Sequence, residues 1–263
     1  MKAWKRIHIT KKRAVCGVLG LLLLAAAYMG VPRAAEKVFA VAEGERRLPI
    51  YCVQTEKPQV SVSFDAAWGA DDTDELLRIL KENDVKATFF LCGYWVEKYP
   101  EEVKKIAAEG HDLGNHSATH PHMSRISSEE IAQELQKCHE NVKKLTGVEM
   151  ELFRPPFGEY DNHVIETAEQ NGYYTIQWDV DSLDWKEQGA EAEIRQVLEH
   201  KHLGNGSIIL FHNDAKYTPK VLDTILKGIK EKGFEIVPIS QLIHRENFEM
   251  DHEGRQILKG KDV

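Results

Sequence analysis

The sequence predicts an α/β fold built on parallel strands. From Pro58 onward, short apolar runs alternate with segments of helical periodicity. Several of the helical segments stop at a glycine, a residue that favours helix C-termini: Gly110, Gly147 and Gly233. Polar and charged residues follow directly after several apolar runs. Alternation of this kind is typical of an α/β barrel or an open parallel sheet.

The expected elements follow one another along residues 58–243. We expect strands at residues 60–64, 87–91, 111–113, 151–153, 173–178, 207–211 and 234–237, and helices at residues 74–82, 100–109, 128–145, 190–200 and 219–232. Residues 36–57 are weakly patterned, and we interpret them as a linker and an entry strand. Residues 244–263 form a polar tail that is expected to be loose after Phe248.

The first 35 residues differ in composition from the rest. They carry seven Lys and Arg and no acidic residue, and an uncharged apolar run occupies residues 14–31. As a helix this run would span roughly 27 Å, near the lower limit for crossing a bilayer. The basic residues before it predict a cytoplasmic N-terminus. We therefore expect a cytoplasmic basic start and a single-pass anchor in residues 1–35, with the rest of the chain outside the cell membrane.

Two other interpretations of the apolar run exist. A cleaved signal peptide needs a shorter apolar region and small residues at the cut, which Ala25, Ala26 and Ala27 could supply. A buried core helix is disfavoured because three basic residues directly precede the run.

The remaining chain is acidic. Residues 36–263 carry 27 Lys and Arg against 42 Asp and Glu, a balance of −15. A nucleic-acid partner would need a basic face that releases counterions, so this balance argues against one. A neutral or cationic glycan remains compatible with it.

The four cysteines do not form a disulfide framework. Cys16 lies in the apolar run, which leaves the odd number of three: Cys52, Cys92 and Cys138. No CxxC pair indicates a structural zinc site. We expect buried thiols with at most one bridge.

Candidate functional residues follow five of the expected strands. In chain order they are Asp65, His116, His120, Arg154, Asp181, Asp184 and His212. In a parallel barrel the C-terminal ends of all strands open onto one face, where active sites are built. Residues scattered over some 150 positions are therefore expected to converge.

The segment HSATH supplies His116 and His120. At this spacing two imidazoles can bind one metal ion if a turn carries them. Pro121 disfavours helical backbone at His120, so we expect a loop. An incidental surface pair is the alternative.

The segment FRPPFG combines Arg154 with two prolines that lack an N–H group. The amide of Phe157 is therefore the first free donor after Arg154, and it could serve an oxyanion. The alternative is a turn with a surface arginine.

Two further segments carry acids and a histidine. DVDSLDW lies between Trp178 and Trp185, which could be sugar-facing platforms, although surface Asx-turns also explain its acids. IILFHND ends an apolar strand in His212, a candidate general acid or base at the strand exit. A satisfied core histidine is the alternative.

Together these segments resemble carbohydrate esterase family 4, the polysaccharide deacetylases with a NodB homology domain. SFDAAWG, HSATH, RPPFG, DSLDW and ILFH occur in the order of the five family motifs, and the resemblance covers residues 58–243. The sequences of these motifs are most similar to those of the sporulation-associated, membrane-anchored branch of Firmicutes. The resemblance implies a distorted (β/α)7 barrel and the metal-assisted removal of N-acetyl groups from chitin-like or peptidoglycan sugars.

The resemblance also implies a metal site with a base beside it. His116 and His120 would hold a divalent metal, with zinc first and cobalt, nickel or manganese as alternatives. Asp65 would be the catalytic base, and Arg154 would pair with it and orient it.

The other roles implied by the resemblance lie across the site. His212 would be the general acid, its protonated form favoured by Asp184. Trp185 and Ile209 would line the acetyl pocket, and the amide of Phe157 would face the oxyanion.

One position departs from the family pattern. The family usually has a second aspartate after the first, as a metal ligand, and here that residue is Ala66. Asp71 or Asp72 could substitute from the loop, although we interpret Asp72 as a helix cap with Glu75 in a capping box. Asp65 itself could bind the metal instead, leaving no dedicated base.

Residues 14–31 predict the membrane as a partner. The resemblance implies an extracytoplasmic N-deacetylase, with cell-wall glycan as its other partner and a role in sporulation, and we expect the chain to be monomeric. A catalytically silent glycan-binding protein that has lost its metal is the first alternative. A hydrolase of another amide or ester is the second.

Overall fold

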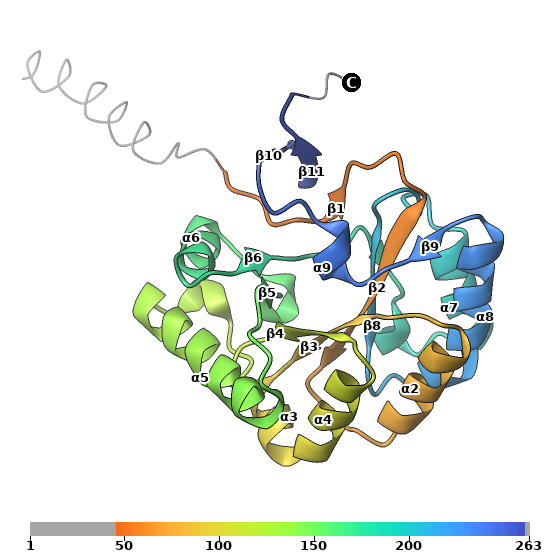
Figure 1. The fold of residues 1–263 in the computed structure, drawn as a ribbon, viewed down its shortest axis with the longest axis horizontal. Coiled ribbons are helices and arrows are strands. Elements are labelled where there is room, and N and C mark those ends of the chain that lie inside the picture. Colours follow the sequence, from red (N-terminus) through yellow and green to blue (C-terminus); the bar gives the residue numbers. More distant parts are fainter. Residues whose placement is uncertain (1–45, 261–263) are drawn as a thin grey trace, which may run out of the picture. The chain divides into compact units, whose positions relative to one another are not determined.

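The structure is a computed structural model that describes residues 46–260. Its main element is an eight-stranded parallel sheet with the order β6-β5-β4-β3-β2-β8-β7, and β9 pairs with the start of β2 (Figure 1). The strands are β2 (Gln59–Ala66), β3 (Thr88–Leu91), β4 (Asp112–Asn115), β5 (Leu152–Phe153), β6 (Tyr174–Thr175), β7 (Val180–Asp181), β8 (Ile208–His212) and β9 (Glu235–Ile236). The predicted parallel α/β architecture is confirmed as a curled half-barrel whose edge strands are β6 and β7.

Except for the last, a short helix that packs with Phe90 and Ile208 in a separate cluster, the helices lie around the outside of this sheet (Figure 1). They are α2 (Thr73–Glu82), α3 (Gly93–Lys98), α4 (Pro100–Ala108), α5 (Ser128–Thr146), α6 (Asn162–Gln170), α7 (Ala190–Leu198), α8 (Thr218–Glu231) and α9 (Ile239–Leu242), with 3-10 turns η1 (Met123–Arg125), η2 (Pro156–Gly158) and η3 (Asp184–Lys186). The longest helix, α5, begins with a capping box between Ser127 and Glu130. It ends at Gly147, whose left-handed backbone (φ 75°) suits glycine.

Strand β2 separates an apolar face from a polar one. Phe64 stacks between Phe89 and Phe211, with ring centroids 4.9 Å and 5.7 Å away, in the core beneath the helices. Side chains alternate along a strand, so Ser63 and Asp65 face the inside of the half-barrel. This inner row of β2 ends at Asp65, one residue before the strand does.

The tail is more ordered than the sequence predicted. β1 (Cys52–Val53), β10 (Phe248–Met250) and β11 (Arg255–Leu258) form a second, three-stranded sheet, so the expectation of a loose chain after Phe248 is wrong up to Leu258. Gln256 is fully buried, and its side chain bonds to both the N–H and the carbonyl of His244. The pairing with β1 and this amide fix the tail.

The predicted anchor, residues 1–35, lies outside the described residues. Within residues 46–260 no helix is long and apolar enough to cross a membrane. The three cysteines of this part, Cys52, Cys92 and Cys138, are buried free thiols, as expected. Burial raises the pKa of both Cys52 and Cys92 to about 12, which keeps these thiols protonated and unreactive.

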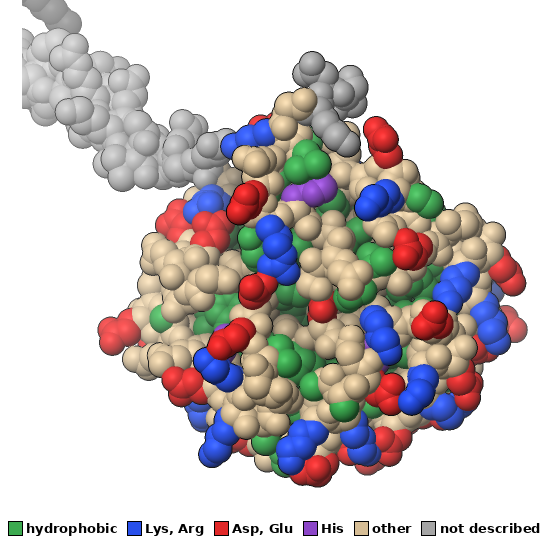
Figure 2. Space-filling view, viewed as in Figure 1, with side chains coloured by type: hydrophobic (Ala, Val, Ile, Leu, Met, Phe, Trp, Pro, Cys, Tyr) green, Lys and Arg blue, Asp and Glu red, His purple; other side chains and the backbone are tan. Residues whose placement is uncertain are grey.

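Charged side chains of both signs are interspersed on the face shown in Figure 2. On this face the described residues form no continuous basic surface.

Candidate active site

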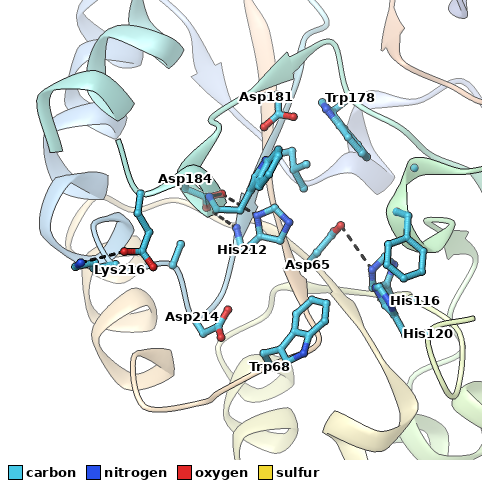
Figure 3. Close-up of a pocket in the computed structure, with 16 residues that line it drawn as sticks. Asp65, Trp68, His116, His120, Trp178, Asp181, Asp184, His212, Asp214 and Lys216 are labelled. Carbon is cyan, nitrogen blue, oxygen red and sulfur yellow. Dashed lines mark hydrogen bonds and ion pairs between the residues drawn. The ribbon is translucent and has the colours of Figure 1, made fainter. Parts of the chain in front are cut away.

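The carboxyl ends of the parallel strands open onto a cleft of about 690 Å³ (Figure 3). Asp65 near the end of β2 and His212 at the end of β8 are paired in the register of the two strands. The cleft is also lined by predicted site residues that follow β4 and β5, or that end or follow β7: His116, His120, Phe157, Asp181, Asp184 and Trp185. Arg154 is fully buried and contacts Asp65. The structure thus brings together residues that lie far apart in the sequence.

Asp65 is kept ionised by its neighbours. Its carboxylate is almost fully buried, and Arg154 Nη1 donates a hydrogen bond to Oδ1 at 2.8 Å. Burial by itself raises the pKa of Asp65, but the charge and hydrogen bond of Arg154, together with His116 and His212, lower it below its usual value. Arg154 is itself held by a hydrogen bond from Nη2 to the Gln177 carbonyl at 3.1 Å. The pair is therefore fixed in place.

His116 presents one defined nitrogen to the cleft. Its Nδ1–H donates to the carbonyl oxygen of Arg154 at 2.7 Å, so the lone pair is on Nε2. That Nε2 lies 3.7 Å from Oδ2 of Asp65 (Figure 3). Burial lowers the pKa of His116, which favours the neutral imidazole. A backbone carbonyl on the far nitrogen is the arrangement that orients metal-binding histidines.

His120 lies on a loop, as Pro121 predicts. Ser117 and His120 both have positive φ, 66° and 58°, and the His120 N–H donates to the Ser117 hydroxyl at 3.0 Å. Glu134 on α5 accepts hydrogen bonds from the N–H and the hydroxyl of Thr119, at 2.7 Å and 2.8 Å. Burial lowers the pKa of His120 to about 4, so this imidazole is also neutral at pH 7. The loop is thus tied to α5 beside the second histidine.

His212 is backed by a carboxylate whose hydrogen-bonding capacity is filled. Oδ1 of Asp184 accepts from His212 Nδ1 at 2.7 Å and from the Trp185 N–H at 2.8 Å. Oδ2 accepts from the His212 N–H at 2.7 Å and from the Thr218 hydroxyl at 3.2 Å. Burial disfavours the imidazolium, but the hydrogen bond and charge of Asp184, with Asp65 and Asp181, raise the pKa of His212. The ring therefore presents Nε2 to the cleft.

Aromatic side chains form the rim of the cleft. Among residues 46–260 the exposed large hydrophobic side chains are Trp68, Phe157 and Trp185, each more than half exposed, and all three line the cleft. Phe157 has a left-handed backbone (φ 60°) in η2. Its ring lies edge-on to His120 and stacks on His122, with centroids 4.5 Å and 4.4 Å away. Exposed aromatic faces around a polar cleft are typical of a ligand-binding surface.

Ile209 does not line the cleft, contrary to the expectation from the resemblance. It is fully buried in the core beneath the helices, together with Phe211. Because side chains alternate along β8, its neighbour Leu210 faces the cleft with His212.

The loop after β2 does not supply a replacement ligand. Neither Asp71 nor Asp72 is among the described residues that line the cleft. The predicted capping box is wrong as well, because Asp72 has helical backbone angles and its side chain makes no cap hydrogen bond. Glu75 bonds to Arg78 instead, at 2.7 Å and 2.8 Å.

The side chains fit a partial metal site. His116 and His120 have ring centroids 4.9 Å apart and are both in the neutral form that binds metals. Within residues 46–260, no three His, Cys, Asp or Glu side chains are grouped as a metal site. Ala66 is fully buried in an apolar cluster that also contains Ala118 of the histidine loop. The donors present would therefore fit a divalent ion held by two imidazoles.

Sequence reasoning missed part of the cleft wall. Trp68 and Asp214 both line the cleft, as do Glu187 and Lys216, which form an ion pair at 2.9 Å. Trp68 and Asp214 each follow a predicted site residue by two or three positions. Their place directly after strands β2 and β8 was the available signal.

The comparisons with known proteins agree with this geometry. Residues 53–176 match the family of polysaccharide deacetylases. The chain is 34% identical over 190 residues to a peptidoglycan-N-acetylglucosamine deacetylase of Bacillus cereus, an alignment that covers 71% of this chain and 68% of the relative. It is 36% identical over 195 residues to YlxY of Bacillus subtilis, covering 74% of this chain and 60% of YlxY.

A solved structure of similar fold bears on the metal site. BA3943 of Bacillus anthracis, described as a pseudoenzyme of carbohydrate esterase family 4, is 36% identical and has a TM-score of 0.71, covering 74% of this chain and 68% of that one. A mutant of BA3943 is described as having restored enzymatic activity. The chain belongs to the polysaccharide deacetylase family, which contains both proteins named as deacetylases and a protein described as a pseudoenzyme.

Proposed function

We propose that this chain is an extracytoplasmic N-deacetylase that removes acetyl groups from N-acetyl sugars of cell-wall peptidoglycan. The observation that carries the proposal is the pairing of two proton-transfer groups in one cleft. Asp65 is ionised by Arg154, and His212 is backed by Asp184 with its pKa raised. A base and an acid whose environments shift their pKa values in opposite directions are what amide hydrolysis requires.

The side chains divide the reaction between them. A divalent ion held by His116 and His120, with zinc as our first choice, would supply Lewis-acid polarisation of the acetamide. Asp65 accepts a proton from the attacking water as the water oxygen bonds to the acetyl carbon. His212 Nε2–H then donates a proton to the sugar nitrogen as the C–N bond breaks, giving acetate and an amine. The Phe157 amide stabilises the oxyanion.

The proposed substrate class and location rest on a relative's name, on the aromatic rim and on the apolar run. A relative at 34% identity is named for deacetylating peptidoglycan N-acetylglucosamine, and the exposed Trp68 and Trp185 offer flat faces for sugar rings. The apolar run of residues 14–31 would anchor the chain in the cell membrane with the catalytic domain outside. We further propose that the chain is monomeric and belongs to the sporulation-associated branch that its motifs resemble.

The test is acetate release by the full chain from peptidoglycan and from chitooligosaccharides, with bound zinc measured on the same sample. We expect acetate from the parent. Asp65→Asn is expected to abolish turnover with nearly unchanged zinc content, because Asp65 is proposed as base rather than ligand. Loss of zinc together with activity would instead make Asp65 the ligand.

A second candidate is glycan binding without turnover. It is favoured by Ala66 and by the absence of a three-ligand cluster within residues 46–260. The parent would then sediment with peptidoglycan but release no acetate even at millimolar zinc. Acetate release that is lost in His212→Gln excludes this candidate.

A further inference from the structure

A chain of buried hydrogen bonds extends behind His212, away from the cleft. The Thr218 hydroxyl, at the start of α8, lies between two carboxyl groups. It is 3.2 Å from Oδ2 of Asp184 and 2.8 Å from Oε1 of Glu193 on α7. Asp184, Thr218 and Glu193 are 2%, 0% and 4% exposed, so bulk water does not separate them.

The protons available do not satisfy two carboxylates. A threonine hydroxyl has a single proton and can donate it once. If Asp184 and Glu193 were both ionised, one of them would face a lone pair of the Thr218 oxygen. Oε2 of Glu193 is also buried without a hydrogen-bond partner among the described residues. An ionised Glu193 would therefore be a buried charge with at most one hydrogen bond, which is costly.

We propose that Glu193 holds a proton in the folded protein and, through Thr218, completes the hydrogen bonds of Asp184, which makes Glu193 a positioning residue for His212. The Glu193 Oε1–H donates to the Thr218 oxygen, and the Thr218 hydroxyl donates to Oδ2 of Asp184. Each proton then has one acceptor. Only in this arrangement are the four hydrogen bonds of Asp184 and the hydrogen bond between Glu193 and Thr218 all present at once.

The electrostatics agree with this proton count. Burial, and secondarily the charge of Asp184, raise the pKa of Glu193 from 4.5 to about 7, against the hydrogen bond of Thr218. Thr218 and Asp184 are the polar groups that act on Glu193 from the neighbouring elements.

Several acidic side chains act on the pKa of His212, and only Asp184 among them belongs to the hydrogen-bond chain described above. Asp184, Asp65 and Asp181 raise its pKa, and Asp214, two residues further on, is coupled to it as well. The hydrogen bond from Thr218 affects the pKa of His212 through Asp184. A carboxylate that loses one of its donors holds its negative charge less diffusely and stabilises the imidazolium more strongly.

Protonation of Glu193 does not depend on the proposed deacetylation. Any effect of Glu193 on turnover, however, rests on that proposed function. The experiment therefore measures protonation directly. The carboxyl carbon of Glu193 is followed by NMR in the full chain as pH is varied, and its signal is assigned by its loss in Glu193→Gln. The imidazole of His212 is titrated in parallel. Glu191→Gln, on the exposed side of the same helix, is the matched control.

We expect Glu193 to stay protonated at pH 6, where an ordinary glutamate is ionised. Glu193→Gln should leave the pKa of His212 unchanged, because an amide N–H replaces the donor to Thr218. Thr218→Val should raise the pKa of His212, because Asp184 loses a donor, and Thr218→Ser should restore the parent value.

Three results would overturn the inference. The first is a Glu193 signal that titrates with exposed glutamates. The second is a lower pKa of His212 in Glu193→Gln, which would show that Glu193 had been charged. The third is a folded Thr218→Val variant with an unchanged His212 titration. Should Thr218→Val fail to fold, the Glu193 titration of the parent decides alone.

Discussion

The two sides of the cleft differ in how completely their polar groups are paired. On the His212 side, Asp184 accepts four hydrogen bonds and is buried behind the ring it orients. On the His116 side, two neutral imidazoles face the cleft, and Ala66 stands where the family pattern has a carboxylate. The proton-transfer side is thus complete within the protein, whereas the metal side is short of a donor. Under the proposed function, turnover by this chain depends on the incomplete side.

Breaking the buried ion pair between Arg154 and Asp65 should have the largest effect, a loss of folding stability. Arg154→Met leaves Asp65 buried and unpaired, and we expect the free energy of unfolding to fall by about 3–5 kcal/mol. Denaturant unfolding measures it. Arg195→Met is the control, because Arg195 and Glu191 form an exposed pair worth at most about 1 kcal/mol. Equal losses in the two variants would contradict a structural role for the buried pair.

Removing the proton donor His212 should abolish proton transfer on its side of the cleft without changing the metal side. His212→Gln is expected to lower turnover by about 10²–10⁴-fold, because a positioned general acid contributes that much. Zinc content and melting temperature should match those of the parent, since His212 is not a proposed metal ligand and is not part of the hydrophobic core. Turnover within a few-fold of the parent would remove His212 from its role.

Loosening the histidine loop should weaken the incomplete side. Glu134→Ala removes the two hydrogen bonds to Thr119 that hold the loop next to His120. We expect zinc affinity, measured by calorimetry, to fall about tenfold, as is typical when a group that supports a ligand is lost. Glu140→Ala on the same helix is the control. If both variants bind zinc alike, the loop does not depend on Glu134.

The smallest expected effect is a shift in pH dependence. Burial lowers the pKa of His212, and Asp184 more than compensates for it. Activity should fall as pH rises through the pKa of His212, because the imidazolium is the acid. Asp184→Asn removes the negative charge, so the pKa falls and the basic limb of the pH–rate profile moves to lower pH. An unmoved limb would mean that Asp184 does not tune His212.

Much of the sheet and of the cleft could be predicted from the sequence. Asp65, His116, Arg154 and His212 lie near or directly after the ends of strands, and parallel strands bring those ends to one edge. The assignment of Ile209 to the cleft came from the family resemblance. Alternation along β8 instead places Leu210, which shares a face with His212, in the cleft.

The missed features depend on contacts between distant segments. β7 has two residues, too few for a periodic pattern, and β11 pairs with β1 across some 200 positions of the chain. Glu193 has the sequence context of an exposed helix charge. Only the packing of α7 against α8 buries it next to Thr218.

The zinc dependence of acetate release by the parent and by Ala66→Asp tests the central claim most directly. A carboxylate at this position adds charge and a third ligand, so Ala66→Asp should reach its full rate at lower zinc than the parent. Ala66→Asn, similar in size but uncharged, should gain less. We predict acetate from the parent at high zinc and a curve shifted to lower zinc in Ala66→Asp. A parent that releases no acetate at any zinc concentration, while Ala66→Asp does, would contradict the proposal and identify the natural chain as catalytically silent.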